Sequence, residues 1–176
     1  MYVVIVTAIF PTFFSAVAAQ GLPPVEATYR FSLATTLGLT IIAVLSPILG
    51  AIADHSAAKK RLLGAFLIFG ATAVAAMFFI RHGQWVFAAL LFILANIGVT
   101  GSFVFYDSLL PHVAAPDEMD RISTAGYALG YLGGGLFLVA CLGIILAPAA
   151  FGLPSGAGLT PTEATLPTRI TFVLTA

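Results

Sequence analysis

The chain has 176 residues, of which 60% are hydrophobic and 8% are charged. A soluble domain carries roughly 25% charged residues, so this composition excludes an ordinary water-soluble globular fold. Seven basic and seven acidic residues cancel, which leaves no long-range field to attract nucleic acid or acidic substrates. Because Cys141 is the single cysteine, an internal disulfide is also excluded.

Five long apolar stretches follow one another and predict an all-α membrane protein. A hydrocarbon core about 30 Å thick needs about 20 helical residues to cross it. Each stretch comes close to or exceeds this length without a formally charged residue, and none has the wide polar face of a soluble helix. The predicted spans cover residues 2–19, 31–53, 62–80, 85–106 and 122–146.

The segment after the fifth span is rich in proline and glycine, which predicts an extended loop over 147–169. A sixth helix is expected over 168–176, where the seven residues after Arg169 cover about 10 Å, a third of the bilayer. We therefore expect a single transmembrane bundle of five complete spans and a truncated sixth, cut at both ends from a longer protein.

Basic residues near span ends predict the orientation, because Lys and Arg stay on the cytoplasmic side. The second connection holds the cluster Lys59, Lys60 and Arg61, and the fourth adds Arg121. The connections on the opposite side carry one basic residue each: Arg30, Arg81 and Arg169. This pattern predicts a multi-pass protein with a cytoplasmic N-terminus, and the alanine- and glycine-rich spans favour a bacterial cytoplasmic membrane.

The most informative polar segment joins the second and third spans. Asp54 closes the second span, where its carboxylate can accept from the free N–H groups at the start of a neighbouring helix. Gly50 lies one turn earlier and permits close approach of that helix. Asp107 closes the fourth span in the same way and could pair with Lys59 or Arg61. These residues form either a conformational latch or a solvated cytoplasmic turn.

The pattern of Gly50, Asp54 and Lys59 resembles the loop motif between helices two and three of the major facilitator superfamily. His55, Ala57 and Ala58 stand at three positions where that motif has Arg, Gly and Arg. A narrower resemblance, to the autophagy-linked vacuolar amino-acid effluxers and their bacterial relatives, covers almost the whole chain. It lies in TAIFP at 7–11, PILGAIAD at 47–54, FYDSLLP at 105–111 and STAGYALGYLGGG at 123–135.

This resemblance implies the N-terminal six-helix bundle of a major facilitator fold. It implies secondary active transport of a small solute by alternating access, with amino-acid efflux as the expected activity. The partners would be the lipid bilayer, the solute and the missing C-terminal helical half of the same protein.

The fifth span carries glycines at spacings of three and four on one helical face: Gly126, Gly130, Gly133 and Gly134. Such a face lets helix backbones approach closely. Helix packing and a direct role in substrate binding are the two interpretations.

Polar residues at membrane depth occur in pairs one helical turn apart: Asn96 with Thr100, Thr36 with Thr40, and Tyr127 with Tyr131. In lipid such groups must find partners, so they either join helices or line a cavity. No formally charged residue lies within the predicted spans, so no coupling site for protons is expected in them.

Three classes of function compete. A transporter is favoured by the resemblance. An intramembrane enzyme would need a nucleophile, base or metal constellation at depth, and neither this nor a metal-ligand spacing or a cofactor motif is found, so we expect no enzyme, metal or cofactor. A non-transporting scaffold or receptor remains the alternative, because glycine-faced helices suit it as well.

Overall fold

The computed structural model describes residues 2–55, 58–113 and 117–176, and in these it is helical with no β-strand. Helix α1 (Tyr2–Phe13) continues as a π-helical turn, η1 (Phe14–Ala18), and α3 (Lys59–Ala76) ends in a 3₁₀ turn, η2 (Met77–Phe79). The other elements are α2 (Pro24–His55), α4 (Trp85–Val113), α5 (Met119–Leu146), the 3₁₀ turn η3 (Pro148–Phe151) and α6 (Pro161–Thr175).

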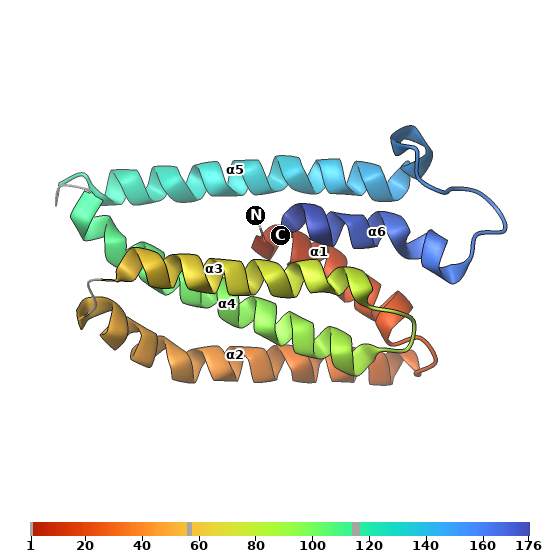
Figure 1. Cartoon of the computed structure of the whole chain (residues 1–176), viewed down its shortest axis with the longest axis horizontal. Coiled ribbons are helices and arrows are strands. Elements are labelled where there is room, and N and C mark those ends of the chain that lie inside the picture. Colours follow the sequence, from red (N-terminus) through yellow and green to blue (C-terminus); the bar gives the residue numbers. More distant parts are fainter. Residues whose placement is uncertain (1, 56–57, 114–116) are drawn as a thin grey trace.

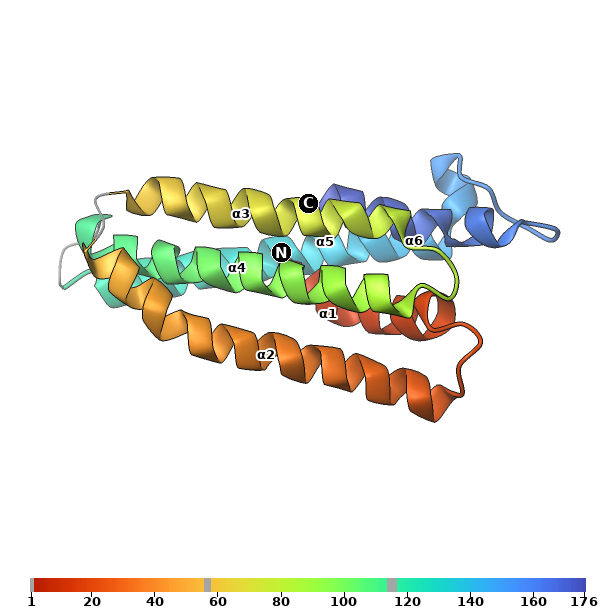
Figure 2. The same ribbon diagram turned by 60° about the horizontal axis from the view of Figure 1, so that its bottom comes forward.

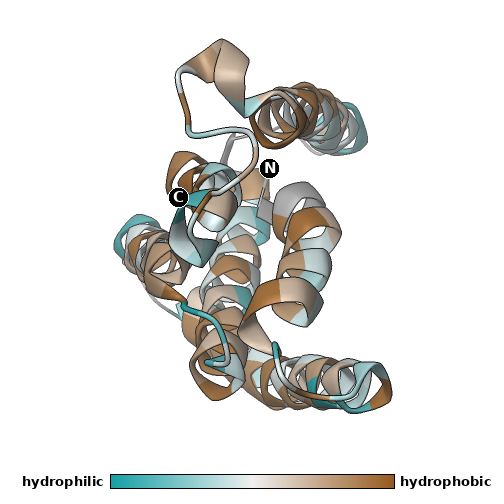
Figure 3. Ribbon diagram, turned by 90° about the vertical axis from the view of Figure 1, so that its right-hand side faces the viewer, coloured by the Kyte–Doolittle hydropathy of each residue, from teal (hydrophilic) through white to brown (hydrophobic). Residues whose placement is uncertain are grey.

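Four helices are long and apolar enough to cross a membrane: α2, α3 with η2, α4 and α5. In the apolar part of α2 and of α5, only 11% of the residues are buried inside the protein, and apolar residues also colour the outward faces of the helices (Figure 3). The chain is therefore an integral multi-pass membrane protein. The prediction of five complete spans is confirmed for four, since the first apolar helix is shorter than the length such a span needs.

The long helices lie side by side along one direction (Figure 1). In Figure 1, α2 and α5 form opposite sides, α3 and α4 lie between them, and α1 and α6 occupy the middle near one end. In the turned view of Figure 2, α3 lies on the side away from α2. We call this end, where the α1–α2, α3–α4 and α5–α6 connections lie, the α3–α4 end. The opposite end, with the α2–α3 and α4–α5 connections, is the α2–α3 end.

Helix α2 begins at Pro24, seven residues before the predicted span. Proline suits the first helical position because its missing N–H would have no helical partner there. The Arg30 guanidinium pairs with the Glu26 carboxylate one turn away and lies 4.0 Å above the Trp85 ring. The two charges that suggested a loop therefore extend the helix beyond its apolar part.

Helix α6 begins at Pro161, so the expected loop over 147–169 and the helix start at 168 are wrong. A capping box explains the earlier start: Thr160 Oγ1 accepts from the Glu163 N–H, and the Glu163 carboxylate accepts from the Thr160 N–H at 2.8 Å. Hydrogen bonds from the Thr160 hydroxyl and N–H hold the pKa of this exposed carboxyl below its usual value. Arg169 consequently lies inside α6, where it is 7% exposed.

Phenylalanine rings from four helices form the core around α1. Phe10 is fully buried and stacks on Phe92 of α4 with 4.9 Å between ring centroids. Phe31 of α2 lies 6.3 Å from Phe10, and Phe172 of α6 meets the Phe13 ring edge-on at 5.2 Å. These tilted and stacked arrangements are the favourable ones for aromatic pairs. The rings therefore fix α1 against α2, α4 and α6.

Glycines bring the backbones of α3 and α4 into close contact. A Cβ atom added to Gly98 would lie 2.4 Å from the Gly70 Cα, and one added to Gly101 would lie 2.3 Å from the Phe66 ring. Real Cβ atoms do not approach other atoms this closely, so only glycine fits at these positions in the present packing. Small residues allow such contacts in lipid, where van der Waals packing replaces the hydrophobic driving force.

We predict that Gly98→Ala destabilises the protein by about 1–3 kcal/mol, because the methyl group would meet the backbone of α3 and not a movable side chain. Gly64→Ala is the matched control, since a Cβ there meets nothing within 4 Å. Reversible unfolding in mixed micelles measures both. Equal stability of the two variants would contradict the close contact.

Candidate functional site

The predicted latch residues lie at the α2–α3 end, where Lys59 connects two helices. Its Nζ donates to the carbonyl oxygen of Ser108 at 3.4 Å, which joins the start of α3 to α4. Lys60 and Arg61 are exposed. Sequence reasoning thus located the basic cluster, and the structure adds a backbone acceptor that the sequence does not reveal.

Asp107 is held by a different partner from the one expected. Its carboxylate accepts from the Tyr127 hydroxyl at 3.2 Å, so it joins α4 to α5. Across the described ranges, Asp107 forms no ion pair with Lys59 or Arg61, and that predicted pairing is wrong. The Tyr106 hydroxyl oxygen lies next to Gly126, 3.2 Å from where a Cβ of that glycine would be. This end of α5 is therefore held by two tyrosines and one carboxylate.

Asp54 is exposed and, in the part of the chain that the structure describes, has no hydrogen bond or ion pair. No atom lies within 4 Å of a Cβ added to Gly50, so this glycine does not serve a close approach inside the bundle. Ser56 and Ala57 of the same connection lie outside the described residues. The latch role of Asp54 therefore remains a proposal that needs a partner beyond these helices.

The glycine face of α5 is mostly open. Gly130 and Gly133 have no atom within 4 Å of an added Cβ, whereas Gly134 is buried. The predicted packing role is thus not seen for Gly130 and Gly133 in the described contacts. Gly70 and Gly98 do pack two helices together. Sequence reasoning missed them because neither belongs to a run of regularly spaced glycines like that of α5.

Two of the predicted cavity-lining side chains, Asn96 and Thr40, form hydrogen bonds within their own helix. Asn96 is half-buried, and its Nδ2 donates to the Phe92 carbonyl at 2.8 Å. The Thr40 hydroxyl donates to the Thr36 carbonyl at 2.8 Å, and both threonines are exposed. Tyr131 is 68% exposed. These residues form no shared site.

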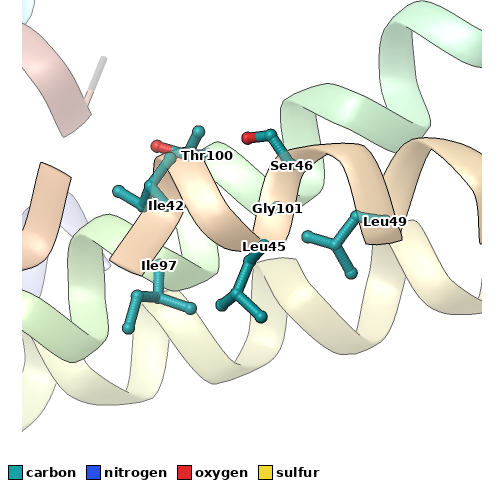
Figure 4. Close-up of a pocket in the computed structure, with 7 residues that line it drawn as sticks. All are labelled: Ile42, Leu45, Ser46, Leu49, Ile97, Thr100 and Gly101. Atoms are coloured by element: carbon teal, nitrogen blue, oxygen red, sulfur yellow. The ribbon is translucent and has the colours of Figure 1, made fainter. Parts of the chain in front are cut away.

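Thr100 lies beside a small pocket between α2 and α4 (Figure 4). Ser46 of α2 supplies the second hydroxyl, and the remaining lining is apolar. The pocket holds about 10 Å³, close to the minimum for one water molecule and far too little for a solute. The structure therefore places Thr100 at a packing defect.

A larger cavity of about 330 Å³ lies between α1 with η1, α5 and α6. This volume falls in the range of small-molecule sites. Its walls are apolar apart from three threonines, Thr12, Thr165 and Thr168, and no charged residue lines it. The remaining lining residues are Ala8, Ile9, Phe13, Ala16, Val17, Leu138, Leu142, Ile145 and Ala164.

Sequence reasoning missed this cavity for two reasons. Thr165 and Thr168 were assigned to the loop, or to its border with the sixth helix, and not to a helical face. Thr12 lies next to Pro11, and two residues after Thr12 the α-helix changes into the π-helical turn η1. In η1 the Ala19 N–H donates to the Phe14 carbonyl at 2.8 Å, a hydrogen bond that spans five residues as in a π-helix. Such turns are frequent at functional sites, and Ala16 and Val17 of this one line the cavity.

Membrane-spanning helices around a cavity are a feature of membrane transport proteins, but they do not identify one by themselves. Comparisons with known proteins supply the family relationship. Residues 26–174 match the family model described as vacuole effluxer Atg22 like. The chain is 33% identical over 153 residues to an uncharacterised MFS-type transporter, YxiO, of Bacillus subtilis, covering 86% of this chain. The chain thus belongs to the Atg22-like family of MFS-type transporters.

Fungal relatives match over shorter segments. Autophagy-related protein 22 of Neurospora crassa is 33% identical over 106 residues and that of Coccidioides immitis is 34% identical over 91 residues, covering 58% and 52% of this chain. The chain spans 36% of the length of the bacterial relative and 14% of each fungal one. No solved structure matches the chain.

We predict that Tyr127→Phe and Asp107→Ala each weaken the attachment of α5 by about 0.5–1.5 kcal/mol, the usual net worth of one hydrogen bond. Their double variant should lose little more than either single one, because both remove the same interaction. Tyr131→Phe is the control, since the Tyr131 hydroxyl has no hydrogen bond in the described structure. Unfolding in mixed micelles measures the cycle, and fully additive losses would argue against the bond.

Proposed function

We propose that this chain forms one lobe of a secondary transporter that moves a small solute by alternating access. The observation that carries the proposal is the match of residues 26–174 to the Atg22-like family, with a relative named as an MFS-type transporter. In this proposal the lobe is the six-helix N-terminal bundle of a major facilitator fold. It lies in a bacterial cytoplasmic membrane with its N-terminus in the cytoplasm, and a second helical lobe completes the carrier.

The cavity between α1, α5 and α6 is the proposed place for the solute in this lobe. Its apolar walls and three threonine hydroxyls suit a small molecule with an apolar part, and no charged residue lines it to select an ion. Amino acids with apolar side chains fit this chemistry, and efflux of amino acids is the activity that the family resemblance implies. Their ammonium and carboxylate groups would then be bound by residues of the second lobe.

The α2–α3 end supplies a rigid base for a rocking motion. Lys59 joins α3 to α4, and Asp107 joins α4 to α5, so three helices are connected at this end. Asp54 and the glycine face of α5 remain exposed, which leaves them free to contact the second lobe. Alternating access then moves this lobe against its partner around the solute.

The cavity is tested by filling it. In the full-length protein in proteoliposomes, Thr168→Leu should reduce the flux of labelled apolar amino acids about tenfold, because the added side-chain volume enters the cavity and removes a hydroxyl. Thr162→Val on the exposed start of α6 should leave flux unchanged, since Thr162 does not line the cavity. Equal flux of both variants would exclude this cavity as the solute site, whereas absence of flux from the unaltered protein for every amino acid would exclude the substrate class.

Asp54→Asn tests the latch. We expect it to slow flux about fivefold while membrane insertion is retained, because about 1 kcal/mol changes the ratio of two conformations by that factor. Asp120→Asn, an exposed carboxylate at the same end, is the matched control. Unchanged flux in Asp54→Asn would leave the residue as part of a solvated turn.

A further inference from the structure

The structure contains one buried arginine that the transport mechanism does not use. Arg169 of α6 is 7% exposed, and its Nε donates to the Phe78 carbonyl at 2.6 Å. The guanidinium carbon lies 5.0 Å from the centre of the Phe78 ring. Among the described residues, this carbonyl is its one hydrogen-bond acceptor. A guanidinium has five N–H donors, so its outer two nitrogens keep donors without a protein acceptor.

No carboxylate in the described ranges balances this charge. The ion pair found there joins Arg30 to Glu26, and the Glu163 carboxylate on the same helix is bound by Thr160. Arg81 follows Phe78 by three residues, and its charge, which acts on Arg169, is of the same sign. Burial of a cation without a counter-charge is costly. The site therefore lacks a negative partner.

His82 holds the α3–α4 connection against α6. Its Nε2 lies 3.2 Å from the Pro161 carbonyl oxygen, which makes Nε2 the donor of that hydrogen bond. Its Nδ1 is buried and has no partner. Two arginines and a histidine with unused polar atoms thus lie where the α3–α4 connection meets α6.

The position of these residues indicates the source of an anion. They lie at the α3–α4 end, where η2 ends at Phe79, which is 66% exposed, and α4 begins at Trp85. Tryptophan is enriched at the headgroup level of a membrane, and arginines near span ends lie at the same level. The solute cavity does not include this group, because Arg169 contacts Phe78 of η2 whereas Thr165 and Thr168 line the contact with α1 and α5.

We propose that Arg169 and Arg81 bind the phosphate group of an anionic phospholipid at the α3–α4 end, beside His82. The planar guanidinium fork matches two phosphate oxygens, and basic pockets between transmembrane helices bind lipid headgroups. Bound phosphate supplies the missing counter-charge and leaves the Phe78 hydrogen bond in place. Free inorganic phosphate offers the same chemistry, and the experiment separates the two sources.

Native mass spectrometry of the detergent-purified protein measures binding of phosphatidylglycerol, with phosphatidylcholine as the neutral-headgroup comparison. We expect a clear preference for phosphatidylglycerol and an about tenfold loss of it in Arg81→Gln, the exposed member of the pair. Arg169→Lys keeps the charge without the fork and should lose part of the preference. The matched control is Arg121→Gln, an exposed arginine at the α2–α3 end.

The folded state of each variant is checked by its thermal unfolding, so that a loss of binding in Arg169→Lys is not confused with misfolding. Millimolar inorganic phosphate tests the second source. If it displaces the lipid, and if it alone raises the unfolding temperature of the unaltered protein but not of Arg81→Gln, the site recognises phosphate and also binds the free ion. Equal binding of the two lipids, or equal lipid loss in Arg81→Gln and Arg121→Gln, would overturn the proposal and leave Arg169 as a tie between α6 and η2.

Discussion

Close fit between helix backbones is the constraint on which this bundle depends. In hydrocarbon, an apolar side chain gains little by turning away from lipid, so helices associate where their surfaces fit. Gly70 and Gly98 allow α3 and α4 to approach more closely than any side chain would permit. On the other side of α4, Gly38 of α2 lies against Ile93. The phenylalanine cluster then fixes α1 and α6 against this three-helix unit.

In the part of the chain that the structure describes, hydrogen bonds between helices lie at the ends of the bundle. Hydroxyl and amide groups within the spans mostly donate to a carbonyl of their own helix three or four residues earlier, as Thr72 and Asn96 do. Such bonds satisfy the group without joining helices. Among the described residues, the hydrogen bonds that cross between elements are Lys59 with Ser108, Asp107 with Tyr127, His82 with Pro161, Arg169 with Phe78, and the Gly83 N–H with the Val17 carbonyl. In the described residues, the middle of the bundle is therefore held by packing alone.

Apolar length, a strong signal, predicted the class and most helix positions, and the resemblance of four sequence segments predicted the family. Sequence reasoning misplaced the starts of α2 and α6, since Glu26, Arg30 and Glu163 were interpreted as loop residues although they stabilise first turns. The sequence also predicted helix packing by the regularly spaced glycines of α5, and it missed the contact between Gly70 and Gly98. Which glycine faces a neighbour depends on how two helices cross, and no single sequence carries that information. The cavity was missed for the same reason, because its threonines come from helices far apart in the chain.

The glycine contact between α3 and α4 joins helices separated by a short connection, from Ile80 to Gln84. Both helices of this contact are therefore present once α4 has been synthesised, before α5 or α6 emerges from the ribosome. Such a hairpin can leave the translocon as a preassembled pair and offer later helices a formed surface. A bulky residue at Gly70 or Gly98 would then act during biogenesis, by delaying the membrane insertion of every helix that follows.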